Sequence, residues 1–271
     1  RIVARVDAGG LLLPDWSYYL SPSAQVLSVR RDYARYLARV VAAAGRPQPV
    51  AEAEAGAVLA FETRMADALR AHTGGPISPR VWSLSEIERA MPGFGWKDWA
   101  KPQGLDQAGG IILDYPEFFR AFAALVGSSP PETLAAWLRV RFLTAMAPYL
   151  PDALASARFE FFGTTLTGQR APRERWKRGV SMVSEFLGDA IGRRYVAAHF
   201  SDTARRRVRA MVAHMVEAAR EGVDDAPWLT PEIRAASERR LATVQAQVGY
   251  PDEGRSYAGL RLQPDTLVEN L

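Results

Sequence analysis

Apolar residues recur along this chain at steps of three and four, and this spacing constrains the fold more than any other feature. Such spacing places side chains on one face of an α-helix, where they can be buried together. The first run ends at Gly45 and Pro47, two residues that terminate helices. It therefore predicts a helix from about residue 24 to 44. Its apolar positions are Val26, Val29, Tyr33, Leu37, Val40, Val41 and Ala44.

Further stripes and helix-start signals cover most of the remaining chain. Ser83 followed by Glu86 matches a capping box, and Thr230-Pro231-Glu232 combines an N-cap residue with proline and acid in the first turn. The helix that starts there is expected to end at Gly249. The other helices are expected around residues 58–69, 116–127, 131–146, 180–191 and 208–216.

Strand signals are few and short. Ile2, Ala4 and Val6 alternate with other residues, as in a strand with one buried face. Residues 109–114 form a second candidate that could pair with the first, and residues 257–262 a third. The sequence predicts a mainly α fold, a multi-helix domain over residues 1–271 with a few short β-strands.

Composition narrows the class of protein. The 271 residues are 48% apolar and 24% charged, which is ordinary for a soluble globular protein. No apolar run approaches the roughly 20 residues of a membrane span. The net charge of +4 favours neither nucleic acid nor an acidic partner. The chain has no cysteine, which excludes disulfides and thiolate zinc ligands.

The most specific motif runs from Phe161 to Arg178, F-F-G-T-T-L-T-G-Q-R-A-P-R-E-R-W-K-R. It resembles a segment in the non-catalytic N-terminal region of the neprilysin family of zinc metallopeptidases. Residues 79–83, P-R-V-W-S, depart from the Tyr-Asn that relatives usually carry. Further matches to the family occur in the same order along the chain as in its members. They lie at residues 7–20, 147–150, 190–196, 228–232, 249–252 (G-Y-P-D) and 268–271 (V-E-N-L).

The resemblance implies both a fold and a function. In that family the helical region caps the zinc-bearing domain, encloses a cavity and limits substrates to peptides. The resemblance implies that the parent protein is a zinc metalloendopeptidase, with this chain's own catalytic domain and peptides as its partners. It favours a periplasmic or extracellular location, although a cytoplasmic one stays open. Animal relatives are disulfide-bonded, so the lack of cysteine indicates a bacterial member.

Catalytic and metal-binding residues are not expected in this chain. The family's zinc motif H-E-x-x-H does not occur, so zinc is expected in a catalytic domain that this chain lacks, and the chain alone should be inactive. The histidines His72, His199 and His214 are too far apart to form a ligand pair one helical turn apart. Glu185 and Asp189 spell E-x-x-x-D, the family pattern of a zinc ligand and its supporting aspartate, but they lie well ahead of the zinc motif in family order.

The arginine-rich segments allow two interpretations. Residues 205–207 with Arg209, and the cluster at 170–178, could contact phosphates. We favour a solvated face, or salt bridges between helices. Arg175 and Trp176 differ, because a guanidinium and an indole in so specific a motif indicate tertiary packing, or contact with the missing domain or a substrate cavity. The acidic partners considered for the salt bridges are Glu217, Glu221, Glu232 and Glu238.

Two other functions stay open from the residues alone. The chain could be a stand-alone α-helical binding or scaffold module without catalytic activity. It could also be an arginine-rich nucleic-acid binder. An H-E-x-x-H motif downstream in the gene would favour the peptidase, and a salt-sensitive complex with DNA or RNA would favour the third function.

Overall fold

The structure, a computed structural model, describes residues 3–251 and 254–270. The chain groups into two compact units, unit 1 (Arg1–Pro172) and unit 2 (Arg173–Leu271). The prediction of one domain over residues 1–271 stays a prediction, because two units can still fold cooperatively. The predictions that involve Arg1, Ile2, Asp252 and Leu271 fall outside the described residues.

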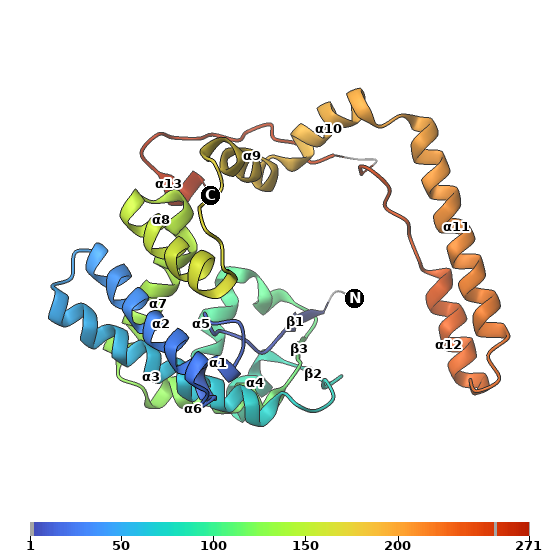
Figure 1. The fold of residues 1–271 in the computed structure, drawn as a ribbon. Coiled ribbons are helices and arrows are strands. Elements are labelled where there is room, and N and C mark those ends of the chain that lie inside the picture. The colour runs from blue at the N-terminus through green and yellow to red at the C-terminus, as the bar shows by residue number, and fades with distance from the viewer. Residues whose placement is uncertain (1–2, 252–253, 271) are drawn as a thin grey trace. The chain divides into compact units, whose positions relative to one another are not determined.

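Two long helices pack against each other in unit 1 (Figure 1). Helix α2 (Ala24–Ala43) follows the N-cap residue Ser23, whose side chain accepts a hydrogen bond from the Val26 amide, and the chain turns at Gly45 with φ +88°. Helix α3 (Gln48–His72) follows and packs against α2. The predicted stripe of α2 supplies most of its buried residues, which are Tyr33, Tyr36, Leu37, Val40 and Val41.

The remaining helices of unit 1 are shorter than this pair. The capping box of α4 is confirmed, since Ser83 and Glu86 exchange the two hydrogen bonds that define it. These helices are α1 (Ser17–Leu20), α4 (Leu84–Ala90), α5 (Trp96–Ala100), α6 (Pro116–Ser128), α7 (Pro131–Met146) and α8 (Asp152–Arg158). Short 3₁₀ turns are η1 (Lys101–Gln103), η2 (Leu105–Gln107) and η3 (Ala147–Tyr149).

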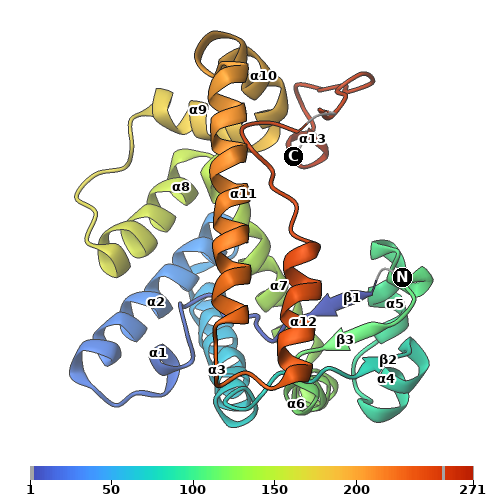
Figure 2. The same cartoon turned by 90° about the vertical axis from the view of Figure 1, so that its right-hand side faces the viewer.

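A small sheet lies at one side of unit 1 (Figure 2). β1 (Ala4–Val6) pairs in parallel with β3 (Ile111–Leu113), which confirms the predicted pairing of the first two strands. The third strand is β2 (Val81–Trp82), antiparallel to β3. The prediction of a strand at 257–262 was wrong, because that segment is irregular. The sequence did not predict β2, because a strand of two residues is too short to show an alternation of apolar and polar side chains.

The F-F-G part of the family-like motif adopts a π-helical turn, η4 (Phe159–Thr165). Phe161 is buried, and its ring centroid lies 5.3 Å from that of Tyr33 and 5.4 Å from that of Tyr36. A Cβ added at Gly163 would lie 2.6 Å from Cε2 of Phe159, so this position accepts only glycine without a shift. The motif's first half therefore serves packing in unit 1.

Unit 2 consists of helices and irregular segments. Its helices are α9 (Arg175–Phe186), α10 (Gly188–His199), α11 (Asp202–Asp224), α12 (Pro231–Ala242) and α13 (Leu267–Asn270). The stripe at 180–191 is divided between two helices at Leu187, whose φ is −120°. The prediction that the helix beginning at Thr230 extends to Gly249 was wrong, since α12 ends at Ala242. Beyond it, the carbonyls of Val248 and Tyr250 accept hydrogen bonds from Arg205 of α11. The mainly α fold is confirmed.

Candidate interaction surface

Unit 2 has almost no interior of its own. Among its described residues only Ala226 and Val248 are buried, and none of the residues of α9, α10, α11 or α12 is. Helices α9, α10 and α11 nevertheless carry apolar stripes, and these stripes together with the exposed Trp228 and Ile233 are what we call the apolar surface of unit 2. Its large exposed residues are Trp176, Val180, Met182 and Val183 on α9, Ile191 and Tyr195 on α10, Val208, Met211 and Met215 on α11, Trp228, and Ile233 on α12.

Such a surface indicates contact with another part of a protein. Isolated amphipathic helices gain most of their stability by burying the apolar face. Contiguous exposed apolar patches on soluble proteins mark interaction sites. The surface also includes a groove of about 690 Å³ between α9 and the C-terminal segment. Its apolar lining includes Met182, Val183, Phe186, Tyr257 and Leu260.

Trp176 lies on this surface and not in a core. Its side chain is 63% exposed, and its Nε1 donates to Glu174 Oε2 at 2.5 Å. Lys177 Nζ donates to the other carboxylate oxygen at 3.0 Å and lies 5.3 Å from the indole centroid. The bonds from Lys177 and then Trp176 lower the pKa of Glu174. Tertiary packing of Trp176 within the chain is therefore not observed. A role for Arg175, also exposed, and Trp176 in an inter-domain contact stays a prediction.

Unit 1 contains a buried carboxylate that the sequence analysis did not single out. Glu62 is fully buried and accepts hydrogen bonds from Tyr19 Oη at 2.9 Å, Tyr33 Oη at 2.6 Å and Trp137 Nε1 at 3.1 Å. Burial raises the pKa of Glu62, and the bonds from Tyr33, Tyr19 and Trp137 oppose the rise. The signal was present, since Glu62 is four residues after Val58 and so lies on the apolar stripe of α3.

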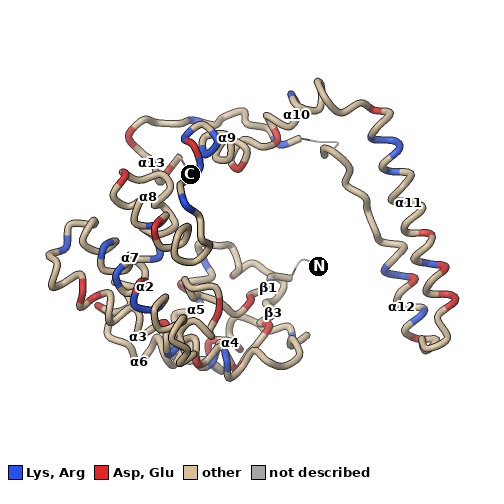
Figure 3. Tube along the Cα trace, in the orientation of Figure 1, with Lys and Arg blue, Asp and Glu red and all other residues tan. Residues whose placement is uncertain are grey.

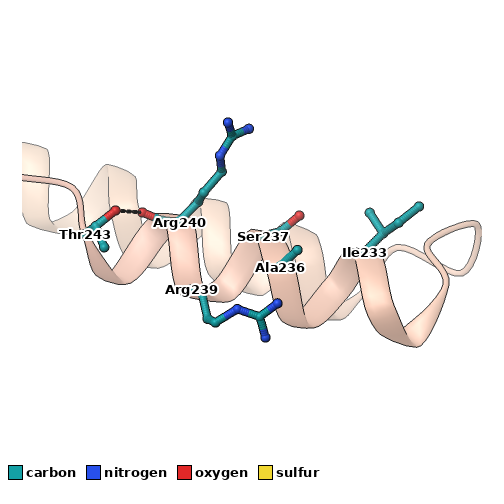
Figure 4. Close-up of a pocket in the computed structure, with 6 residues that line it drawn as sticks. All are labelled: Ile233, Ala236, Ser237, Arg239, Arg240 and Thr243. Atoms are coloured by element: carbon teal, nitrogen blue, oxygen red, sulfur yellow. Dashed lines mark hydrogen bonds between the residues drawn. The ribbon is translucent and has the colours of Figure 1, made fainter. Parts of the chain in front are cut away.

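The arginines of unit 2 do not form one anion-binding cluster. Figure 3 shows basic and acidic residues interspersed along α11 and α12. Arg205 donates to backbone carbonyls, and Arg206 donates to Thr203 Oγ1 at 3.0 Å. Arg205 was expected on a solvated face or in a salt bridge, and its hydrogen bonds to backbone carbonyls were not predicted. On α12, Arg239 and Arg240 line a shallow hollow but leave the helix in different directions (Figure 4).

Similarity to known proteins identifies the family of this chain. Residues 1–251 match the model of the N-terminal region of Peptidase family M13. The chain belongs to peptidase family M13. The predicted resemblance to the neprilysin family is confirmed by relatives that carry this name.

Solved structures and curated proteins agree with that assignment. Mycobacterium tuberculosis zinc metalloprotease Zmp1, in complex with an inhibitor, is 32% identical, with a TM-score of 0.83 over 100% of this chain and 41% of the Zmp1 chain. Human endothelin-converting enzyme-like 1 is 23% identical over 93% of this chain and 33% of its own length. Drosophila melanogaster neprilysin-2 is 22% identical over 88% of this chain and 34% of its own. The chain thus spans about a third of these curated relatives.

The described residues of this M13 chain do not fit a zinc site. Within residues 3–251 and 254–270, no group of three or more His, Cys, Asp or Glu side chains could hold a metal ion. His72, His199 and His214 are all exposed, and so is Glu185. Asp189 instead accepts a hydrogen bond from the Arg255 amide at 3.2 Å. In the described part of the chain, no helix is long and apolar enough to cross a membrane.

Proposed function

We propose that this chain is the non-catalytic helical part of a zinc metalloendopeptidase. It would cap the active-site cavity and restrict entry to peptides. Zinc and the residues that activate water would belong to a catalytic domain that packs on the apolar surface of unit 2. The parent protein would act in the periplasm or outside the cell, a placement that rests on the family resemblance.

One observation carries the proposal: the helices α9, α10 and α11 of an M13 chain expose their apolar stripes and bury none of their own residues. A partner domain that covers these stripes would supply the burial that the helices lack. Membership of a peptidase family supports a catalytic domain as that partner. Trp176 would be one anchor of the contact, since Trp is enriched among residues that dominate interface energies.

The experiment uses the chain and the zinc-bearing region of the same gene, expressed separately. The catalytic region is recognised by an H-E-x-x-H motif in the reading frame downstream. Binding of a partner to the folded form only raises the melting temperature of the chain. We expect such a rise, together with zinc-dependent cleavage of short peptides and exclusion of folded proteins by the complex. No mutual stabilisation, or equal cleavage of folded proteins with and without the chain, would overturn the proposal.

The alternative is a stand-alone helical binding or scaffold module, which the same exposed stripes could serve. The reading frame distinguishes the two, because a scaffold gene would lack the zinc motif. A nucleic-acid binder has less support, since Arg205 already uses its donors on backbone carbonyls and Arg239 and Arg240 diverge. A salt-sensitive complex with DNA or RNA would reverse that judgement.

A further inference from the structure

Residues 248–251 and 254–255, which we together call the 248–255 segment, contact α10 and α11. The contact with α11 is made by Arg205 and by Asp202, whose Oδ1 accepts a hydrogen bond from Tyr250 Oη at 3.4 Å. Arg205 Nε donates to the Val248 carbonyl at 3.2 Å and Nη2 donates to the Tyr250 carbonyl at 2.9 Å. The Arg205 guanidinium carbon also lies 3.9 Å from the centroid of the Tyr250 ring. A planar guanidinium can make both bonds and stack on the ring at once, which a lysine cannot do.

The same segment contacts the junction of α10 and α11. Phe200 connects the two helices, and its ring meets that of Tyr250 edge to face, with centroids 6.4 Å apart. Gly249 has φ +77°, and a Cβ added there would lie 2.5 Å from Phe200 Cε1. Both the backbone conformation and the close approach therefore require glycine.

Two side chains of α10 hold the other end of the segment. Asp189 Oδ2 accepts a hydrogen bond from the Arg255 amide at 3.2 Å, and Arg193 Nη2 donates to the Arg255 carbonyl at 3.0 Å. The two side chains are four residues apart and so lie on one face of the helix. Together they satisfy both backbone groups of a single residue.

We propose that the 248–255 segment fixes α10 and α11 relative to each other and thereby sets the shape of the apolar surface of unit 2. Neither helix has a buried residue, so no interior packing fixes their relative orientation. The segment instead joins them through Arg205 and Phe200 on one side and Asp189 and Arg193 on the other. Arg205, Asp189 and Arg193 are positioning residues, and the part of the proposal that concerns docking rests on the proposed function.

Hydrogen exchange of the isolated chain tests the fixing of the helices without any partner. Arg205→Ala should speed exchange roughly tenfold or more in residues 188–200 and 254–255, because these amides would lose the segment that holds them. Arg206→Ala is the matched control, because Arg206 is exposed and bonds within α11, to Thr203. Arg205→Lys should restore part of the protection, since an ammonium can still donate to a carbonyl. Equal exchange in the Arg205→Ala and Arg206→Ala chains would overturn the proposal.

A second measurement tests the link to docking. The rise in melting temperature that the zinc-bearing region causes should be smaller for Arg205→Ala than for Arg206→Ala. An unchanged rise despite faster exchange would overturn the claim that the segment shapes the surface. If the wild-type chain shows no rise, the proposed function fails, while the exchange experiment still decides whether the segment fixes the helices. Gly249→Ala, which leaves every arginine in place, repeats both measurements if Arg205→Ala does not fold.

Discussion

At the scale of single residues, the buried carboxylate of Glu62 dominates the polar interior of unit 1. It accepts hydrogen bonds from Tyr19, Tyr33 and Trp137, which belong to α1, α2 and α7. Tyr19 Oη also accepts a bond from the Leu13 amide at 3.0 Å, which extends the network to the segment before α1. Glu62 thus joins three elements to α3, and a change there affects all of them.

We expect Glu62→Gln to lower the free energy of unfolding by about 1–3 kcal/mol, because an amide nitrogen would face donors that now share a carboxylate. Urea unfolding of the chain measures the change. Glu52→Gln on the same helix is the control, since Glu52 is exposed and should change stability by less than about 0.5 kcal/mol. Equal effects of the two substitutions would show that the network adds no stability.

The pH dependence of stability should also report Glu62. Burial raises the pKa of Glu62 above its ordinary value of 4.5, so the folded state binds this proton more tightly than the unfolded state. The stabilising contribution of the protonated group is complete below pH 4.5 and is lost as pH rises through the raised pKa. As the pH rises, the wild type should therefore lose stability relative to the Glu62→Gln chain. A difference that grows with pH would contradict the raised pKa.

At the scale of elements, the family-like motif at residues 161–178 begins in η4 and ends in α9, and its two ends have different roles. Phe161 on η4 is buried among tyrosines of α2, whereas Trp176 on α9 is exposed. One sequence motif thus contributes to packing at its start and to an open surface at its end.

In the chain alone, Trp176→Ala should change the free energy of unfolding by less than about 0.5 kcal/mol, because an exposed side chain loses little burial. Phe161→Ala should cost about 3–5 kcal/mol, as expected for a buried aromatic residue. Denaturant unfolding measures both. With the zinc-bearing region present, Trp176→Ala should reduce the mutual stabilisation. A large loss of stability in the isolated chain would restore the interpretation of Trp176 as a packing residue.

At the scale of the whole molecule, the two units differ in how their helices are stabilised. The cores of unit 1 bury residues from α2, α3, α6 and α7, while unit 2 buries only Ala226 and Val248 among its described residues. Local opening costs little free energy where few apolar contacts are lost. The units should therefore differ in local stability even when they belong to one chain.

Hydrogen exchange of the isolated wild-type chain should show this difference directly. Amides of α9 to α12 should exchange much faster than those of α2 and α3, because their helices lack buried faces. Addition of the zinc-bearing region should slow exchange selectively in unit 2. If the amides of α11 were protected as strongly as those of α3 in the absence of a partner, unit 2 would be stable without a domain that packs on it.

The sequence by itself determined most of the helices, two of their N-caps, the first strand pair and the family. These features follow from local spacing, as in α2 and the Ser83–Glu86 capping box, or from a specific motif. Only the tertiary structure decided which stripes are covered, because burial depends on a neighbouring element that spacing does not reveal. Leu37 is buried and Met211 is exposed, although both lie on regular apolar stripes. The tertiary structure likewise decided that Arg205 of α11 binds backbone carbonyls of the segment beyond α12, since that contact joins residues more than forty positions apart.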